Sequence, residues 1–276
     1  MIRTIIVPLE GTPASDVALR CAVRLARWHD ARVVMLASAQ AEALPETASA
    51  YADAEFEDGE EAEDEELELE PGVSVADHPL VDAAAALCGR HRVAWRAEGC
   101  AGDPTGHLAH YAPRADVVTV SRRGSRAVRR ELPRHAFAIL RASVRAVLLT
   151  PETYQEPQVI LAPYDRSAPA ARALSLAAET SVRAELPLTV VSVGGDAFTA
   201  ASLAEARRYL AAYSGQTEFV RREGDPVQQL TALTFELPGA LLVMAGYGRP
   251  PVRRLLGGSR TERILAGCHG PALIVR

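Results

Sequence analysis

The sequence predicts an α/β fold made of two tandem doubly wound parallel-sheet domains. Short apolar runs rich in β-branched residues alternate with longer segments of helical periodicity, which is typical of a parallel sheet with helices on both faces. The alternation restarts near Glu156, so the 276 residues divide into a first domain, residues 1–155, and a second domain, residues 156–276. Several short motifs also recur in the same order in both domains.

The first domain begins with a strand, Ile2 to Pro8, which a proline ends. Thr12 and Pro13 then supply an N-cap and a first-turn proline for a helix that reaches about Trp28. The following elements alternate in type: a strand over Arg32 to Leu36, a helix from about Val81, a strand around Val93 to Arg96, a helix from about Pro104, a strand over Asp116 to Val120, a helix near Phe137 and a strand over Ala146 to Thr150.

The second domain repeats this order. Val159 to Pro163 is again a strand that ends in proline, and Ser167 with Pro169 again opens a helix. Further strands are expected over Leu188 to Val193, Ala240 to Met244 and Ala272 to Val275.

Matching anchors indicate a tandem duplication with one insert. The anchors are Pro8 and Pro163, 155 residues apart, Gly102-Asp103-Pro104 and Gly224-Asp225-Pro226, 122 apart, and Gly124 and Gly248, 124 apart. The first domain therefore carries about 31 additional residues between its second and third strands, at about residues 41–72. Twelve of the 35 acidic residues of the chain lie there, between Asp53 and Glu70.

Composition excludes several classes of protein. The 30 basic residues are all arginines, so Schiff-base enzymes, Walker-type phosphate loops and kinases with a catalytic lysine are excluded. The net charge is −5, and without the twelve clustered acids the rest of the chain carries about +7. No apolar run approaches the roughly 18 residues of a membrane span and no signal peptide is evident, so we expect a cytoplasmic protein without a membrane partner.

The four cysteines are scattered and form no CxxC pair, so we expect reduced, buried thiols and neither a zinc site nor a redox motif: Cys21, Cys88, Cys100 and Cys268. His107 and His110 are spaced for a metal on a helix, but no third ligand is near, so they are expected to be structural or surface residues. Trp28 and Trp95 are expected in the core. No metal site and no catalytic residue are predicted.

A glycine-rich loop follows a strand near the end of the second domain. It contains Met244-Ala245-Gly246-Tyr247-Gly248, and after nine further residues Gly258-Ser259 opens the last helix. Glycines let backbone N–H groups approach an anion, and a serine at a helix start adds a hydroxyl to the helix dipole. The loop is therefore a candidate phosphate site, although a ligand-free turn with Ser259 as N-cap fits these residues equally well.

This loop resembles a motif of the universal stress proteins, and the chain as a whole is similar to a tandem pair of such domains. ATP-binding members carry G-x2-G-x9-G-S/T; Gly248, Gly258 and Ser259 fit this spacing, whereas Ala245 replaces the first glycine. We expect this departure to weaken binding without abolishing it, and the neighbouring Gly246 to compensate in part.

The resemblance implies a site for ATP or a related adenine nucleotide, with or without Mg²⁺, in the second domain. The adenine and ribose would be framed by Pro163, Tyr164, Asp165 and Val193, and the phosphates would be held by Met244, Ala245, Gly246, Gly248, Gly258, Ser259 and Arg260. A plain turn or helix-capping carboxylate is the alternative interpretation of Asp165.

The first domain departs from the same motif. Gly124 is present, but Ser121 stands at the first glycine and Pro133-Arg134-His135 occupies the place of Gly-Ser. Glu10 stands where the family has aspartate. We therefore expect a degenerate copy that does not bind ATP in the family manner.

Six arginines occupy the corresponding loop of the first domain: Arg122, Arg123, Arg126, Arg129, Arg130 and Arg134. They are compatible with an anion site, with a solvated face, or with a surface over which the acidic insert folds.

The resemblance implies a stress-response sensor or regulator that binds a nucleotide without substantial catalysis. It also implies that Ala146 to Thr150 and Ala272 to Val275 pair the two domains as an internal pseudo-dimer, and a homodimer of the whole chain is a further expectation. The alternative is a nucleotide-free interaction module that recruits an unknown protein partner through the acidic insert and the arginine-rich loop. Nucleic acid is not an expected partner.

Overall fold

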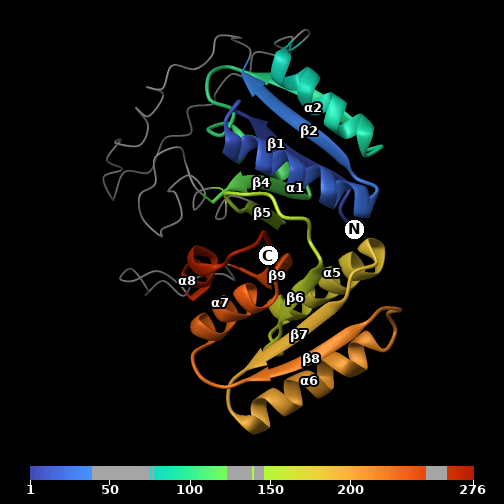
Figure 1. Cartoon of the computed structure of the whole chain (residues 1–276), viewed down its shortest axis with the longest axis vertical. Coiled ribbons are helices and arrows are strands. Elements are labelled where there is room, and N and C mark those ends of the chain that lie inside the picture. The colour runs from blue at the N-terminus through green and yellow to red at the C-terminus, as the bar shows by residue number, and fades with distance from the viewer. Residues whose placement is uncertain (39–74, 76–77, 123–138, 140–145, 247–259) are drawn as a thin grey trace.

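The computed structural model describes residues 1–38, 75, 78–122, 139, 146–246 and 260–276 (Figure 1). Ten strands of these residues form one sheet in the order β3-β2-β1-β4-β5-β10-β9-β6-β7-β8. The strands are β1 (Thr4–Leu9), β2 (Arg32–Ser38), β3 (Trp95–Cys100), β4 (Val117–Ser121), β5 (Ala146–Thr150), β6 (Val159–Pro163), β7 (Leu188–Val193), β8 (Thr217–Arg222), β9 (Ala240–Ala245) and β10 (Ala272–Val275).

The described helices connect these strands. They are α1 (Pro13–His29), α2 (Pro79–Arg90), α3 (Leu108–Tyr111) with a 3₁₀ turn (Ala112–Arg114), α5 (Ala168–Ala184), α6 (Asp196–Leu210), α7 (Pro226–Glu236) and α8 (Arg260–Gly267). The first half of the molecule comprises the elements up to β5, and the second half those from β6 onwards. The predicted α/β fold with tandem domains is confirmed.

The two halves have the same strand order and meet at their last strands. Every strand pair is parallel except β5 with β10, which run antiparallel with Leu149 opposite Ala272 and Ala146 opposite Val275. The sheet is therefore mixed but mostly parallel. The strand pairing expected for an internal pseudo-dimer is observed, because β5 and β10 pair with each other and join two five-stranded units.

Capping side chains start the equivalent helices α1 and α5 as the sequence predicts. Thr12 Oγ1 accepts a hydrogen bond from Ser15 N (3.1 Å), and Ser167 Oγ accepts one from Ala170 N (3.2 Å). Each bond satisfies one of the backbone donors that a helix start leaves free.

Apolar residues cover both faces of the sheet, as a parallel sheet between helices requires. Ile5, Leu25 and Leu174 lie in the core on the side of α1 and α5, and Leu149 and Leu242 lie in the core on the opposite side. The four cysteines are free and buried, as expected.

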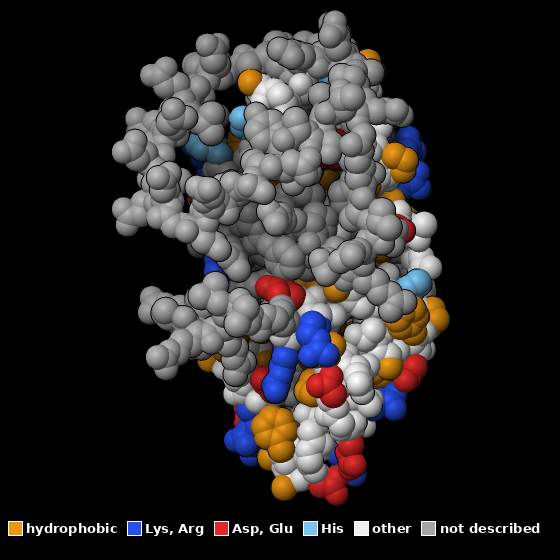
Figure 2. All heavy atoms as spheres, turned by 90° about the vertical axis from the view of Figure 1, so that its left-hand side faces the viewer, with side chains coloured by type: hydrophobic (Ala, Val, Ile, Leu, Met, Phe, Trp, Pro, Cys, Tyr) orange, Lys and Arg blue, Asp and Glu red, His pale blue; other side chains and the backbone are white. Residues whose placement is uncertain are grey.

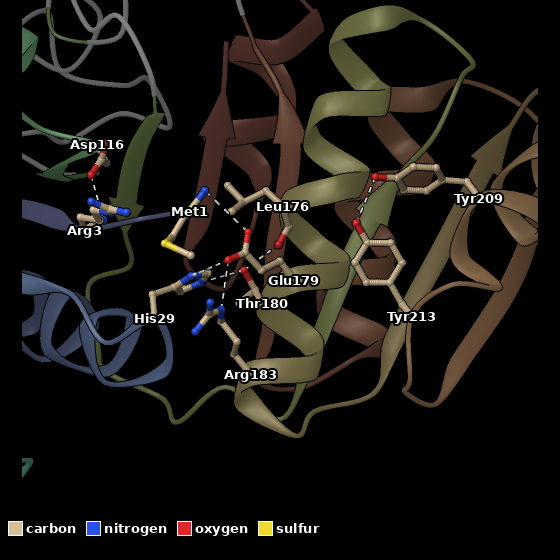
Figure 3. Close-up of polar contacts among 10 residues, drawn as sticks. All are labelled: Met1, Arg3, His29, Asp116, Leu176, Glu179, Thr180, Arg183, Tyr209 and Tyr213. Carbon is tan, nitrogen blue, oxygen red and sulfur yellow. Dashed lines mark hydrogen bonds and ion pairs between the residues drawn. The ribbon is translucent and has the colours of Figure 1, made fainter.

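Helices α1 and α5 contact each other across the boundary between the halves (Figure 3). His29 Nε2 at the end of α1 lies 3.0 Å from Thr180 Oγ1 of α5. Arg24 Nε of α1 lies 2.7 Å from Glu156 Oε1, in the segment that enters the second half. The halves are thus joined by helix contacts as well as by the sheet.

The third strand and the following helix of the first half differ from the sequence prediction. The strand is Trp95–Cys100 instead of Val93 to Arg96, and the Trp95 side chain is exposed (42%), contrary to expectation, because β3 is an edge strand. The helix expected from Pro104 begins only at Leu108, because the Asp103 carboxylate accepts hydrogen bonds from the next backbone N–H groups and forms a turn instead.

Parts of the prediction lie outside the described residues: the insert at about residues 41–72, most of the helix near Phe137, and five of the six clustered arginines. In the second half, the sequence prediction gave no bounds for α6, β8 and α7.

Candidate functional site

The carboxyl ends of β6 and β9 define the candidate site in the second half. These strands are neighbours, yet the chain leaves β6 toward β7 on one side and β9 toward β10 on the other. In open α/β sheets, ligands bind in the crevice at this kind of switch point. Figure 2 faces the side toward which the arrowheads of β7 and β8 point in Figure 1, and basic and acidic side chains lie close together there on the lower part of the surface.

Asp165 follows Tyr164 just after the end of β6, and its side chain is exposed. One carboxylate oxygen, Oδ1, accepts a hydrogen bond from Ser167 N (3.0 Å) at the start of α5. This hydrogen bond supports the alternative interpretation of Asp165 as a turn carboxylate. The same exposed carboxylate can also accept hydrogen bonds from ligand hydroxyl groups.

Tyr164 is buried, and its hydroxyl donates a hydrogen bond to Glu205 Oε1 on α6 (2.6 Å). Burial and this contact with the Glu205 carboxylate raise the pKa of Tyr164 to about 12. The side chain thus belongs to the packing between β6 and α6. Pro163, half-buried at the end of β6, completes this wall of the site.

Two residues beside the site were missed by the sequence prediction. Arg166 has a left-handed backbone (φ 67°), and its Nε donates to Glu205 Oε2 (2.9 Å). Its counterpart in the first half, Gly11, is also left-handed (φ 69°), so the turn is kept although glycine is not. The offset of 155 residues could have identified Arg166, but no local signal marks Glu205, which lies 39 residues away.

Gly246 is buried at the end of β9, and its N–H donates to Val275 O (2.9 Å). A Cβ atom at this position would lie 2.2 Å from Ile274 Cγ2. Packing against β10 therefore requires glycine here whether or not a ligand binds. The Gly246 N–H already donates to Val275 O, so it is not available to a phosphate. Met244 is buried and Ala245 half-buried in the same strand.

The remaining site residues are only partly described. Val193 is half-buried at the end of β7, beside Gly194 and the start of α6, and Arg260 is the exposed first residue of α8. Gly248, Gly258 and Ser259 lie outside the described residues. The parallel strands thus bring Pro163 to Asp165, Val193 and Met244 to Gly246 to one edge of the sheet.

The corresponding acid of the first half, Glu10, has a different environment. Thr105 Oγ1 donates a hydrogen bond to Glu10 Oε1. Burial raises the pKa of Glu10, with a smaller contribution from Asp103, while the Thr105 hydrogen bond lowers it. In the second half, Val227 stands at the position that corresponds to Thr105, directly after the matching tripeptide Gly224-Asp225-Pro226. This position therefore offers Asp165 no hydroxyl group.

Arg122 is the one residue of the predicted arginine cluster that the structure describes. Its guanidinium donates to the carbonyl oxygens of Cys268 and Gly270 in the second half. This arginine therefore contacts backbone instead of forming a freely solvated face.

The histidines that the sequence singled out have protein contacts. His107 Nε2 lies 2.6 Å from Ala101 O, and His110 packs its ring edge-on against Tyr111. In the described part of the chain, no three His, Cys, Asp or Glu side chains gather as a metal-binding group. None of the described helices is long and apolar enough to cross a membrane.

Two stretches, residues 1–151 and 157–276, match the Universal stress protein family. The chain belongs to this family. A universal stress protein of Synechocystis sp., Slr1230, is 28% identical over 166 residues, and the match spans 58% of each chain, so this chain matches little more than half of that relative's length.

Solved structures show the same fold over nearly the whole chain. A universal stress protein from Archaeoglobus fulgidus superposes with a TM-score of 0.72 at 16% identity, covering 98% of this chain and 97% of its own. A functionally unknown protein from Pseudomonas aeruginosa PAO1 gives 0.65 at 18% identity, covering 99% and 92%. At these identities the likeness concerns the fold alone.

Proposed function

We propose that the second domain, residues 156–276, binds ATP or a related adenine nucleotide, and that the protein acts in the cytoplasm as a stress-response sensor or regulator without substantial catalysis. The first domain, residues 1–155, is a degenerate copy that does not bind ATP in the family manner. The observation that carries the proposal is the difference between Asp165, whose carboxylate is exposed at the switch point of the sheet, and Glu10, whose carboxylate accepts a hydrogen bond from Thr105.

The described residues fit the adenosine part of such a ligand. The Asp165 carboxylate can accept hydrogen bonds from ribose hydroxyls, and Val193 offers an apolar contact for the base. Arg260 is an exposed cation at the start of α8, where a phosphate is favoured electrostatically. Mg²⁺, when bound together with the nucleotide, would neutralise part of the negative charge of the phosphates.

A nucleotide-free interaction module is the second candidate. Two observations favour it: Asp165 already has a turn partner in Ser167, and Gly246 is explained by packing against Ile274. In this case a protein partner would recognise the acidic insert and the arginine-rich loop.

Calorimetric titration of the nucleotide-stripped chain with ATP and Mg²⁺ distinguishes the two candidates. The proposal predicts saturable binding at about one site per chain, lost in Gly248→Val, which would crowd the phosphates, and kept in the first-domain counterpart Gly124→Val. Absence of both heat and thermal shift at millimolar ATP would support the interaction module instead. Phosphate release is expected to stay at the level of a buffer blank.

A further inference from the structure

Arg122 and Gly246 occupy the same backbone position in the two halves. Each directly follows the fourth strand of its half, and its N–H donates to the end of the fifth: Arg122 N to Thr150 O (3.1 Å) and Gly246 N to Val275 O (2.9 Å). Gly246 has no room for a side chain, because Ile274 Cγ2 fills the place of its Cβ. A side chain can therefore extend from this position in the first half, but there is no space for one in the second half.

The Arg122 side chain reaches across to the second half. Its Nη1 donates to Cys268 O and its Nη2 to Gly270 O (2.6 Å), 146 and 148 residues further along the chain. Because two N–H groups of the planar guanidinium donate hydrogen bonds, both the position and the orientation of the group are fixed. Arg122 thus connects the first half to the segment between α8 and β10.

This segment directly follows the last turn of α8. Cys268 N donates to Ile264 O in the last turn of the helix (2.8 Å), and Pro271 O accepts from Leu242 N of β9 (3.0 Å). A Cβ at Gly270 would lie 2.3 Å from Ala240 O, so the turn is pressed against β9. The cation lies where the carbonyls at a helix C-terminus concentrate negative charge, and this favours the contact.

The opposite end of α8 belongs to the proposed nucleotide site. The helix spans Arg260–Gly267, about 12 Å at 1.5 Å per residue, and two of its own side chains, Ile264 and Leu265, are buried. A short packed helix that is fixed at one end is also restrained at the other. Arg260, at its first residue, is one of the proposed phosphate contacts.

We propose that Arg122 of the first half is a positioning residue for the nucleotide site of the second half, because it anchors the C-terminal end of α8 and thereby holds Arg260 in place. This inference rests on the proposed function. The degenerate first domain, without nucleotide of its own, then supplies a contact that the second domain cannot make for itself. The second half cannot make the corresponding contact with the first half from this position, because Gly246 has no side chain.

The test compares Arg122→Gln, which removes the charge, with Arg122→Lys, which keeps it. Arg20→Gln is the matched control, because Arg20 is exposed and pairs with Asp16 one turn away on α1. Hydrogen exchange followed by mass spectrometry would report the amides of Leu242 and Cys268, and calorimetry the affinity for ATP. We expect faster exchange at both amides and about threefold to tenfold weaker ATP binding in Arg122→Gln, partial recovery in Arg122→Lys, and no change in Arg20→Gln.

The outcomes separate the two proposals. Unchanged exchange in Arg122→Gln overturns the anchor, and faster exchange with unchanged affinity overturns its link to the site. If the unaltered chain does not bind ATP, the proposed function and the link both fail, while the exchange data still decide the anchor. Should Arg122→Gln not fold, saturating ATP in the unaltered chain must slow exchange at Cys268, because coupling acts in both directions. Unaltered exchange there overturns the link.

Discussion

At the scale of single residues, the two halves differ at positions that correspond through the duplication. Glu10 meets the hydroxyl of Thr105, whereas Asp165 is exposed and the residue matching Thr105 is Val227. These exchanges change which polar groups are free at the carboxyl edge of each half without changing the strands. The proposed function attributes the nucleotide site to one half only on the basis of such differences, since a site is determined by its residues and not by the fold.

Gly246→Ala is expected to lower the free energy of unfolding by about 1–3 kcal/mol, because the new Cβ would lie 2.2 Å from Ile274 Cγ2. Urea denaturation measures the change. The matched control is Gly89→Ala near the end of α2, where no heavy atom lies within 4 Å of the new Cβ and a helical alanine should stabilise by about 0.5–1 kcal/mol. Equal effects of the two substitutions would contradict the packing role of Gly246.

Correspondence between the repeats predicts part of the site and packing determines the rest. Asp165 and its counterpart Glu10 follow from the 155-residue offset between two strands that end in proline. The contacts of Arg122 with Cys268 and Gly270 could not be predicted, because they depend on how two halves dock and span almost 150 residues. The Tyr164 and Glu205 contact likewise depends on where α6 lies.

At the scale of elements, the contact between α1 and α5 contains a buried histidine (Figure 3). Thr180 Oγ1 donates to Leu176 O (2.7 Å), so it can only accept from His29 Nε2. His29 Nδ1 then faces Glu179 Oε1 at 3.9 Å, with Arg183 and the Met1 amino group on the same carboxylate. The neutral imidazole donates through Nε2 and joins the two helices.

Burial lowers the pKa of His29 to about 4 although Glu179 acts in the opposite direction, and Arg183 and the amino group lower it further. The unfolded chain takes up this proton near pH 6.5, before the folded chain does, so the free energy of unfolding falls as the pH drops from about 6.5 toward 4. Between about pH 7.5 and 4.5 the loss should be about 2–3 kcal/mol. Urea denaturation at several pH values should show this loss in the unaltered chain and not in His29→Gln. Parallel pH profiles of the two proteins would contradict it.

Helices with capping residues were predictable, and exposed edge elements were not. Thr12 and Ser167 mark the starts of α1 and α5 because a local hydrogen bond identifies each of them. Strand β3, at the edge of the sheet, has the pattern WRAEGC with little buried apolar surface, so its limits were misplaced. Strand β8, at the other edge, is similarly charged.

At the scale of the whole molecule, β5 and β10 make the two domains one sheet. Contacts between α1 and α5 and from Arg122 to the end of α8 reinforce this union. The resemblance to the family implied this pairing, and the apolar character of both last strands suits it. We therefore expect the halves to unfold together, as one cooperative unit.

Calorimetric unfolding of Leu25→Ala in α1 and Leu174→Ala in α5 tests this expectation. Both side chains are fully buried, and each substitution should cost about 2–5 kcal/mol. A single transition should move to lower temperature in both variants, since each weakens the same unit. Two separable transitions, with each substitution moving only its own, would contradict the expectation.

Whether one domain alone binds nucleotide is the central claim, and a paired titration tests it most directly. ATP with Mg²⁺ would be titrated into nucleotide-stripped Asp165→Ala and Glu10→Ala, two equivalent carboxylates in the two halves. We predict that Asp165→Ala loses about tenfold or more in affinity, as expected for a hydrogen bond to a charged group, while Glu10→Ala binds like the unaltered chain at one site. Equal losses in both variants, or a loss in Glu10→Ala alone, would contradict the assignment of the site to the second domain.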